Sequence, residues 1–469
     1  MTPDMSAHFH HWLDHPPDLL GLSRANPEEF PYLLESSAGG PLGSHSLLLH
    51  ATGPALVSQA GHSLTGPGEG DSFFERLADW FGRESLPRGE VGGNDALPFC
   101  GGWFVYLGYE MAAEIEPTLA LPVAATGLPD AIAQRCPGAI IVFHGGENRA
   151  DRAVAVAESP ALLQQLRNRV ASAHDLPAEA AGFADPPVES ITEENPERFK
   201  AAVRRIHEYL LAGDTFQVNI SRPWTGRFGT EPDPYRLYHS LRRANPAPFA
   251  GLMRWKRHFL LSSSPERLVQ VHGRTVQTRP IAGTRPRGRD SVQDRALSAE
   301  LISNLKERAE HVMLIDLERN DLGRVCRPGT VEVNELMVVE TYAHVHHIVS
   351  NVRGELAATA GPIDAMKAVF PGGTITGCPK VRCMQIISEL EGAGRSFYTG
   401  SMGYLGRDGS MDLNILIRSM LVHGREFAFR TGAGIVADSD PEQEVLETAD
   451  KARGMLLALE SHGREKIYA

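Results

Sequence analysis

Apolar and polar residues alternate over residues 216 to 221, and this pattern predicts a strand with two different faces. Phe216, Val218 and Ile220 fall on one face, and the polar residues between them, Gln217 and Asn219, fall on the other. Antiparallel sheets commonly turn their polar face to water. The alternation alone therefore leaves open whether these polar side chains meet solvent or a ligand.

A helical pattern stands directly before this strand. Asn195 is placed to cap a helix, Pro196 suits its first position and Gly213 suits its end. Apolar residues recur between them at helical spacing, which predicts an amphipathic helix with one buried face. These residues are Phe199, Val203, Ile206 and Leu210.

Strands are predicted in runs elsewhere. Residues 262 to 288 are typical of a strand, a turn at His272 and Gly273, and a second strand, and residues 31 to 50 predict two strands around a glycine break. Because strands cluster in hairpins and do not alternate with helices, the pattern favours an α+β fold over a doubly wound parallel sheet. Later helices are expected at about 294 to 316, 362 to 368, 379 to 391 and 441 to 460.

Residues 175 to 196 shift in composition to proline, alanine and acidic residues, which predicts a domain boundary. We expect an N-terminal region over residues 1–185 and a catalytic region over residues 190–469. A chain of 469 residues has room for two to three domains or for one large interleaved unit.

Composition limits the functional classes. With 42% hydrophobic and 22% charged residues, the chain is typical of a globular protein, and its net charge of -12 argues against a general nucleic-acid binder. The N-terminus lacks an apolar leader, and no window approaches the roughly 18 apolar residues of a membrane span. Five cysteines without CxxC spacing predict free thiols in a reducing cytoplasm. They are Cys100, Cys136, Cys326, Cys378 and Cys383.

Two pairs of acidic residues have a spacing that matters on a helix. Glu307 and Glu310 form one pair and Glu444 and Glu447 the other, so that each pair lies on one helix face within reach of one ion. Lys451 follows Glu447 by four residues. On the last helix the apolar stripe lies away from these charges, and the pattern by itself favours a solvated face.

Eight sequence blocks, in a fixed order, resemble the chorismate-utilising enzymes, a family that includes the component I chains of anthranilate and aminodeoxychorismate synthases. The resemblance runs from about residue 190 to the end and, more weakly, through the first 120 residues. It implies the anthranilate synthase component I fold, with large antiparallel sheets packed as a sandwich and helices outside. The blocks are GDTFQVNISR, SSSPERL, QTRPIAGT, KERAEHVMLIDLERNDLGRV, HVHHIVS, FPGGTITGCPKVR, GSMGYLGRDGSMDLNILIRS and TGAGIVADSDPEQEVLETADKA.

The resemblance assigns the two acid pairs to Mg²⁺. Glu310 and Glu447 would be direct ligands, and Glu307 and Glu444 would help directly or through water. Mg²⁺ prefers oxygen and is usually held by one or two carboxylates together with waters and substrate. The ion would bind the ring carboxylate of chorismate, and Lys451 would add a second positive charge to that group.

The resemblance also implies a substrate pocket. Arg418 matches the arginine that forks onto the enolpyruvyl carboxylate. Glu266 would be the general acid that protonates the departing 4-hydroxyl, and His347 matches a histidine near that ring position. The other substrate-binding positions are Tyr398, Thr374, Gly283, Thr284 and Gly434.

Gln217 stands where water-adding relatives carry a lysine that activates water. A neutral amide cannot act as that base, so ammonia, which is already a nucleophile, is the expected second substrate. The chain carries no glutaminase block, and ammonia is therefore expected from a separate glutamine amidotransferase subunit.

Within the family, the QVN sequence at 217–219 and the PGG sequence at 371–373 favour the aminodeoxychorismate synthases. Ala282 points the other way, because many of those enzymes carry PIKGT, whose lysine attacks the ring. The predicted reaction is Mg²⁺-dependent amination of chorismate to 4-amino-4-deoxychorismate, for p-aminobenzoate and folate, without that lysine adduct. The alternatives are anthranilate synthase component I and a non-catalytic subunit that binds chorismate or tryptophan.

Leu34, Glu35 and Ser36 match a stretch that lies beside a tryptophan pocket in the relatives. The same residues are equally typical of a buried strand whose serine begins a turn. Both interpretations stay open at this point.

Overall fold

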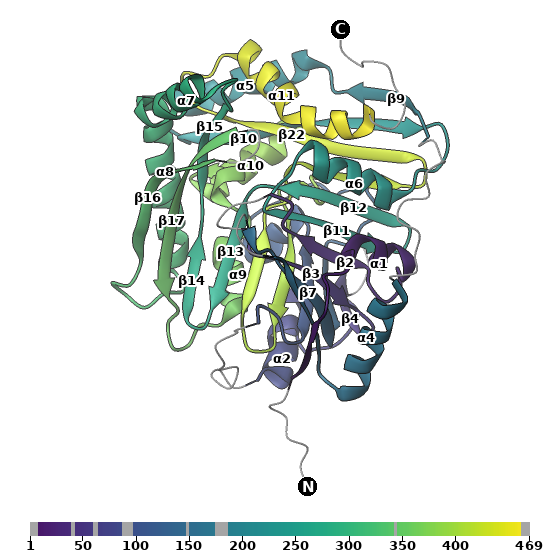
Figure 1. Ribbon diagram of the computed structural model, residues 1–469. Coiled ribbons are helices and arrows are strands. Elements are labelled where there is room, and N and C mark those ends of the chain that lie inside the picture. Colours follow the sequence, from purple (N-terminus) through teal and green to yellow (C-terminus); the bar gives the residue numbers. More distant parts are fainter. Residues whose placement is uncertain are drawn as a thin grey trace.

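The computed structural model describes residues 8–38, 43–59, 64–86, 97–146, 150–173, 186–341 and 345–460. Within these ranges the chain forms two large antiparallel sheets with helices outside them, which confirms the predicted α+β class (Figure 1).

One sheet, called here the first sheet, contains 12 strands within the described ranges and runs in the order β1-β8-β7-β3-β2-β11-β12-β21-β22-β10-β18, with β9 paired to β10. Its strands are β1 (Phe9–Leu13), β2 (Tyr32–Glu35), β3 (His45–His50), β7 (Gly138–Phe143), β8 (Arg152–Ala157), β9 (Val188–Glu193), β10 (Gln217–Phe228), β11 (Phe249–Trp255), β12 (His258–Ser264), β18 (Gly377–Cys378), β21 (Ser419–His423) and β22 (Glu426–Ile435).

The second sheet contains 10 strands in the same described part of the chain, in the order β15-β17-β14-β13-β20-β19-β5-β6-β4, with β16 paired to β17. Its strands are β4 (Ala55–Ser58), β5 (Gly102–Leu107), β6 (Ala131–Cys136), β13 (Arg267–His272), β14 (Thr275–Thr278), β15 (Ile281–Pro286), β16 (Glu332–Thr341), β17 (Val345–Glu355), β19 (Ser401–Gly406) and β20 (Met411–Asn414).

Helices and short 3-10 turns connect the strands. They are α1 (Leu19–Ala25), α2 (Phe73–Glu84), η1 (Tyr109–Met111), α3 (Ala112–Ile115), α4 (Pro160–Ala173), α5 (Pro196–Leu211), α6 (Pro234–Ala244), α7 (Ser291–Ser303), α8 (Leu305–Gly323), α9 (Pro362–Val369), η3 (Gly373–Ile375), α10 (Lys380–Glu391) and α11 (Pro441–Glu460).

The two sheets face each other across an apolar layer. Tyr32 of the first sheet stacks on Phe104 of the second, with ring centroids 3.7 Å apart and an angle of 6° between the planes. Leu49, Met253 and Tyr106 belong to the same buried cluster. The predicted sandwich is thus present, and its inner layer is built from residues on both sheets.

Helices cover the outer faces. Helices α4, α6 and α11 pack on the first sheet, α2, α8 and α9 pack on the second, and α5 and α10 pack on β10 (Figure 1). The predicted helix after Asn195 is confirmed, since the Asn195 side chain accepts from the Glu197 backbone at 3.0 Å. Val203 and Ile206 of this helix are fully buried.

Strands from both halves of the chain share each sheet. In the first sheet β2 pairs with β11, and in the second β5 pairs with β19. The regions before and after residue 185 are therefore interleaved. Residues 174–185, which include most of the predicted boundary, lie outside the described residues.

Two local predictions need correction. The helix expected over 294–316 is two helices, because Asn304 ends α7 in an extended conformation and its side chain accepts from the Glu307 backbone of α8 at 3.2 Å. Phe216 does not share the buried face of β10: it is 68% exposed, whereas Val218 and Ile220 are buried. The strand begins one residue later, at Gln217.

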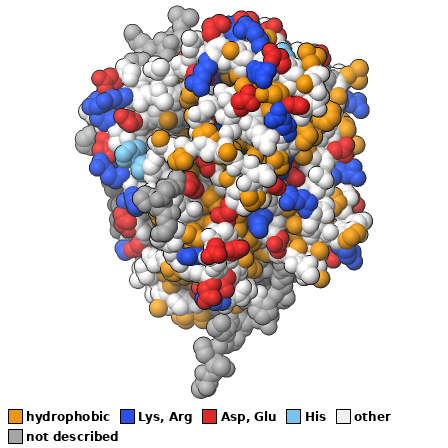
Figure 2. Space-filling model, turned by 180° about the vertical axis from the view of Figure 1, so that it is seen from behind, with side chains coloured by type: hydrophobic (Ala, Val, Ile, Leu, Met, Phe, Trp, Pro, Cys, Tyr) orange, Lys and Arg blue, Asp and Glu red, His pale blue; other side chains and the backbone are white. Residues whose placement is uncertain are grey.

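The described surface carries mixed charge. On the face in Figure 2, acidic and basic side chains are interspersed with apolar ones. In the described part of the chain, no helix is long and apolar enough to cross a membrane, and all five cysteines are free thiols, as predicted.

Candidate active site

Glu266 is the buried acid at the centre of the candidate site. It lies in the short connection between β12 and β13 and is only 6% exposed. The hydroxyl of Thr374 donates to its carboxylate at 2.7 Å. Burial raises the pKa of Glu266 to about 7, and the Thr374 bond and the positive charges of Arg418 and Lys451 oppose that rise. This carboxyl can therefore hold or release a proton near neutral pH.

The charge of Arg418 acts on both this acid and His347. Arg418 has a left-handed backbone (φ 51°), a conformation that costs free energy outside glycine and is common at functional sites. Its carbonyl accepts from the Ser263 backbone at 3.1 Å, which fixes it against β12. His347 is 2% exposed, and burial, with the charge of Arg418, lowers its pKa to about 3. Its imidazole is therefore neutral.

Two glycines of β22 allow side chains to approach the backbone closely. A Cβ on Gly434 would lie 2.3 Å from the Nε2 of Gln217, and a Cβ on Gly432 would lie 2.7 Å from the hydroxyl of Tyr398. The ammonium group of Lys451 donates to the Gly432 carbonyl at 3.0 Å. The structure thus brings the predicted residues Gln217, Tyr398, Gly434 and Lys451 to one stretch of β22.

Gly283 brings strand β15 to helix α8. It has φ +68°, and a Cβ there would lie 3.0 Å from the Oε2 of Glu307. The side chain of Thr284 lies outside the described atoms, while its backbone pairs with His347. Ala282 is 9% exposed on the same strand, so no amine stands at this position.

The four predicted metal ligands all lie on helices. Glu307 accepts from Arg285 at 3.3 Å, and Glu447 pairs with Lys451 at 2.7 Å. Glu444 is buried (8% exposed), against the solvated face that its sequence pattern favoured, and Glu310 is partly buried.

Within the described residues, no group of three or more histidine, cysteine or acidic side chains is close enough to hold a metal together. Their convergence on one ion therefore stays a prediction. The donors are hard carboxylate oxygens on two helices, and one or two of them suffice for Mg²⁺ when substrate and water supply the rest. The residues present fit that ion.

The stretch that resembles a tryptophan-pocket sequence lies at the end of strand β2, and both of its interpretations stay open. Leu34 and Glu35 line a cavity of about 300 Å³ between the two sheets, and Glu35 accepts from Tyr238 at 2.8 Å. Ser36 is not among the lining residues. Its hydroxyl donates to the Ala38 carbonyl, as expected for a serine that begins a turn.

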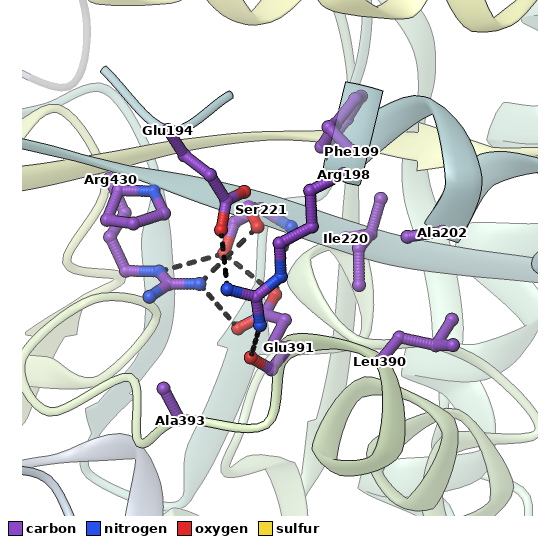
Figure 3. Close-up of a pocket in the computed structure, with 11 residues that line it drawn as sticks. Glu194, Arg198, Phe199, Ala202, Ile220, Ser221, Leu390, Glu391, Ala393 and Arg430 are labelled. Atoms are coloured by element: carbon purple, nitrogen blue, oxygen red, sulfur yellow. Dashed lines mark hydrogen bonds and ion pairs between the residues drawn. The ribbon is translucent and has the colours of Figure 1, made fainter. Parts of the chain in front are cut away.

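The sequence analysis missed a buried ionic network behind β10. Glu391 is 6% exposed and accepts from Arg395 at 2.6 Å, from Arg430 at 2.8 Å and from the Ser221 hydroxyl at 2.8 Å. Figure 3 shows Arg430, Ser221 and Glu391 around a cavity of about 60 Å³, with the Glu194–Arg198 pair at its side.

Arg395 connects this network to the candidate site. It donates to the carbonyls of Asn219 and Ile375 at 2.8 and 3.2 Å, and its guanidinium lies 5.6 Å from the Tyr398 ring centre. It therefore ties together β10, the η3 turn that carries Thr374, and Tyr398. The only sequence signal was the four-residue spacing of Glu391 and Arg395, which a surface pair at a helix end also shows.

Comparisons with known proteins bear on this geometry. The family model described as chorismate binding enzyme matches residues 62–457. The chain is 43% identical over 367 residues to the anthranilate synthase component I-like protein of Synechocystis, covering 78% of this chain and 74% of that one. It is 39% identical over 451 residues to anthranilate synthase component 1 of Streptomyces coelicolor, covering 92% and 84%.

A third relative is named as an aminodeoxychorismate synthase. The chain is 48% identical over 284 residues to aminodeoxychorismate synthase component 1 of Bacillus subtilis, a match that spans 61% of this chain and 58% of that protein. Among solved structures, anthranilate synthase component I from Streptococcus pneumoniae superposes with a TM-score of 0.76 at 30% identity, over 89% of this chain and 93% of that one.

The fold and the matched length define a class of enzyme, and the chain belongs to the chorismate-binding enzyme family. Within that family it is close to anthranilate synthase component I, and aminodeoxychorismate synthase is also among its relatives.

Proposed function

We propose that this protein aminates chorismate with ammonia to give 4-amino-4-deoxychorismate, for the synthesis of p-aminobenzoate and folate. The observation that carries the proposal is Glu266, a buried acid with a pKa of about 7. The positive charges of Arg418 and Lys451 act on its carboxyl group. A neutral amide, Gln217, stands in place of a water-activating lysine. The QVN and PGG motifs and the Bacillus subtilis relative support 4-amino-4-deoxychorismate as the product.

The protonated Glu266 supplies the proton that the departing 4-hydroxyl needs. The ring carbon loses its C–O bond, whose electrons leave with water, and it gains a C–N bond to ammonia, which gives up a proton. Chorismate and ammonia thus balance 4-amino-4-deoxychorismate and water. A carboxyl that is protonated near pH 7 is suited to this task.

The substrate carries two carboxylates, and one basic side chain would bind each of them. Arg418 would fork onto the enolpyruvyl carboxylate, and Lys451 would meet the ring carboxylate. Glu307, Glu310, Glu444 and Glu447 are the residues that would hold Mg²⁺, which when bound adds positive charge at the ring carboxylate. The neutral His347, with Tyr398, Thr374, Gly283, Thr284 and Gly434, would complete the pocket.

Ammonia would come from a separate glutamine amidotransferase subunit, in keeping with the component naming of the relatives. The cavity beside Leu34 and Glu35 is proposed as the counterpart of the tryptophan pocket of the relatives.

A second candidate function is anthranilate synthase component I. Ala282, in the PIAGT form usual in those enzymes, and the names of several relatives favour it. The third candidate, a non-catalytic binding subunit, has no need of a buried acid tuned to neutral pH.

The deciding experiment is a product assay with purified protein, chorismate, Mg²⁺ and ammonium at alkaline pH, with and without added aminodeoxychorismate lyase. We expect p-aminobenzoate only when the lyase is present. Anthranilate formed without the lyase would assign the protein to tryptophan synthesis instead. Absence of any amination product would overturn both assignments.

A further inference from the structure

Tyr398 lies in an irregular connection and not in a helix or strand. This connection, residues 395–399, follows α10 and leads to β19, and is called here the Tyr398 loop. Two of its residues, Ser396 and Thr399, have positive φ angles of 54° and 62°. That backbone region costs free energy for residues other than glycine, so it persists only where surrounding contacts hold it.

Contacts that hold the start of the loop come from the N-terminal part of the chain. Glu110, in the η1 turn, is partly buried, and its Oε1 accepts from the backbone N–H of Arg395 at 2.6 Å and of Ser396 at 3.2 Å. Its Oε2 lies 3.1 Å from the same Ser396 nitrogen. A carboxylate forms stronger hydrogen bonds than a neutral acceptor does. Glu110 therefore fixes two consecutive backbone N–H groups, although it is 285 residues away from Arg395 in the sequence.

Neighbours of Glu110 support the same segment. The Tyr109 backbone N–H donates to the Ser396 carbonyl at 2.7 Å, and the Tyr109 ring centre lies 4.9 Å from the Arg395 guanidinium. The hydroxyls of Thr126 and Ser396 are hydrogen-bonded at 2.7 Å. The N-terminal part of the chain thus binds both the backbone and the side chains at the start of the loop.

The far end of the loop belongs to the candidate site. Tyr398 is 4% exposed, and a Cβ on Gly432 would lie 2.7 Å from its hydroxyl. The Gly432 carbonyl accepts from Lys451. The Thr399 backbone N–H donates to the Leu416 carbonyl at 2.8 Å, two residues before Arg418. A shift of the loop would therefore move the Tyr398 hydroxyl relative to the basic side chains of the site.

We propose that Glu110 is a positioning residue, whose carboxylate holds the Tyr398 loop in the conformation that lets the Tyr398 hydroxyl bind chorismate. The inference rests on the chorismate pocket of the proposed function. Glu110 acts through the loop and does not itself bind the substrate. The N-terminal part of the chain would in this way contribute to substrate affinity, because a small displacement of a binding group weakens its contact sharply.

The test is a double-mutant cycle on chorismate affinity, measured by equilibrium titration with Mg²⁺ and without ammonium. Tyr398→Phe removes the hydroxyl, and Glu110→Ala removes the acceptor that holds the loop. We expect each to weaken chorismate binding about tenfold, the size of one lost hydrogen bond. The double variant should bind within about twofold of the weaker single variant, because both changes remove the same interaction.

Conservative variants separate positioning from a general loss of structure. Glu110→Gln keeps an acceptor for the two N–H groups, and we expect it to bind chorismate within about twofold of the wild type. Glu110→Asp keeps the charge but is one CH₂ shorter, so it should weaken binding several-fold. It carries the test if Glu110→Ala does not fold.

Glu114 of α3 offers a matched control. Its carboxylate also accepts from two consecutive backbone N–H groups, those of Phe73 at 3.1 Å and Phe74 at 2.8 Å, but they belong to the start of α2. Glu114→Ala should lower the unfolding midpoint about as much as Glu110→Ala does. It should leave chorismate affinity within about twofold, alone or combined with Tyr398→Phe.

Unchanged chorismate affinity in Glu110→Ala or in Tyr398→Phe would overturn the inference. So would losses that multiply in the double variant, or an equal loss of affinity in Glu114→Ala. A wild-type protein that binds chorismate but does not aminate it would instead overturn the proposed function, and the binding cycle would still decide the role of Glu110.

Discussion

At Glu266, burial and polar contacts act in opposite directions on a single proton. Loss of solvent favours the neutral acid, whereas the Thr374 hydroxyl and the charges of Arg418 and Lys451 favour the carboxylate. The balance leaves a pKa of about 7. A more exposed carboxyl would be ionised at the pH where ammonia is available, and it could not donate a proton.

This balance predicts a pH dependence. With rates expressed against unprotonated ammonia, kcat/KM should fall as pH rises above about 7, because Glu266 loses its proton. Glu266→Gln should lower kcat by roughly 10²- to 10⁴-fold, as for other general acids, and should leave chorismate binding within a few-fold. Steady-state kinetics across pH 6 to 9 and equilibrium binding would measure both. Persistence of the alkaline fall in the Gln variant would assign the titration to another group.

At the scale of elements, one arginine joins three pieces of the site. Arg395 lies in the connection that follows α10, pairs with the buried Glu391 at the end of that helix, and donates to carbonyls of β10 and η3. Because β10 lies far from η3 and α10 in the sequence, its position relative to them depends on this tie more than on local preference.

Removing the contacts of Arg395 should lower the free energy of unfolding more than removing a surface ion pair does. Arg395→Gln leaves the Glu391 charge buried with fewer partners, and we expect a loss of about 3–5 kcal/mol in the free energy of unfolding. Arg382→Gln is the matched control, because its pair with Asp214 is about one-third exposed and should cost less than about 1 kcal/mol. Urea denaturation measures both. Equal losses would show that Arg395 is no more important than a surface residue.

For the whole molecule, several buried acids carry raised pKa values. Burial raises the pKa of Glu110 and of Glu266 to about 7, and burial with nearby Asp321 raises that of Glu318 to about 8. Burial lowers the pKa of His347 to about 3 and that of His311 to about 4. The acids bind protons more tightly when folded, so their stabilising effect is lost as pH rises. The histidines lose theirs only as pH falls below about 6.5.

The free energy of unfolding should therefore decrease between pH 6.5 and 8.5, by roughly 3 kcal/mol in total from the three acids. Glu110→Gln, whose side chain still accepts the backbone N–H groups that Glu110 binds, should reduce this decrease by about 1 kcal/mol. Denaturant unfolding at several pH values measures the slope. A stability that rises over this range would contradict the assignment of these raised pKa values.

The sequence by itself determined the elements whose signals are local. Asn195 and Pro196 begin a helix because a cap and a fixed φ act within one turn, and the α+β class follows from strands clustered in hairpins. The blocks around Glu266, Arg418 and Lys451 predicted a chorismate-binding enzyme, and the family match confirms that class.

Only the tertiary structure decided which polar groups are buried and what they meet. Glu266 and Thr374 are 108 residues apart, and the Glu391 carboxylate meets a serine 170 residues earlier in the chain. The desolvation of a buried carboxyl and the charges around it depend on residues that are distant in the sequence, and no local pattern encodes them. Gln217 and Asn219 were visible in the sequence only as a polar strand face; the packing of β10 against β22 buries their amide oxygens without a hydrogen-bond partner among the described residues.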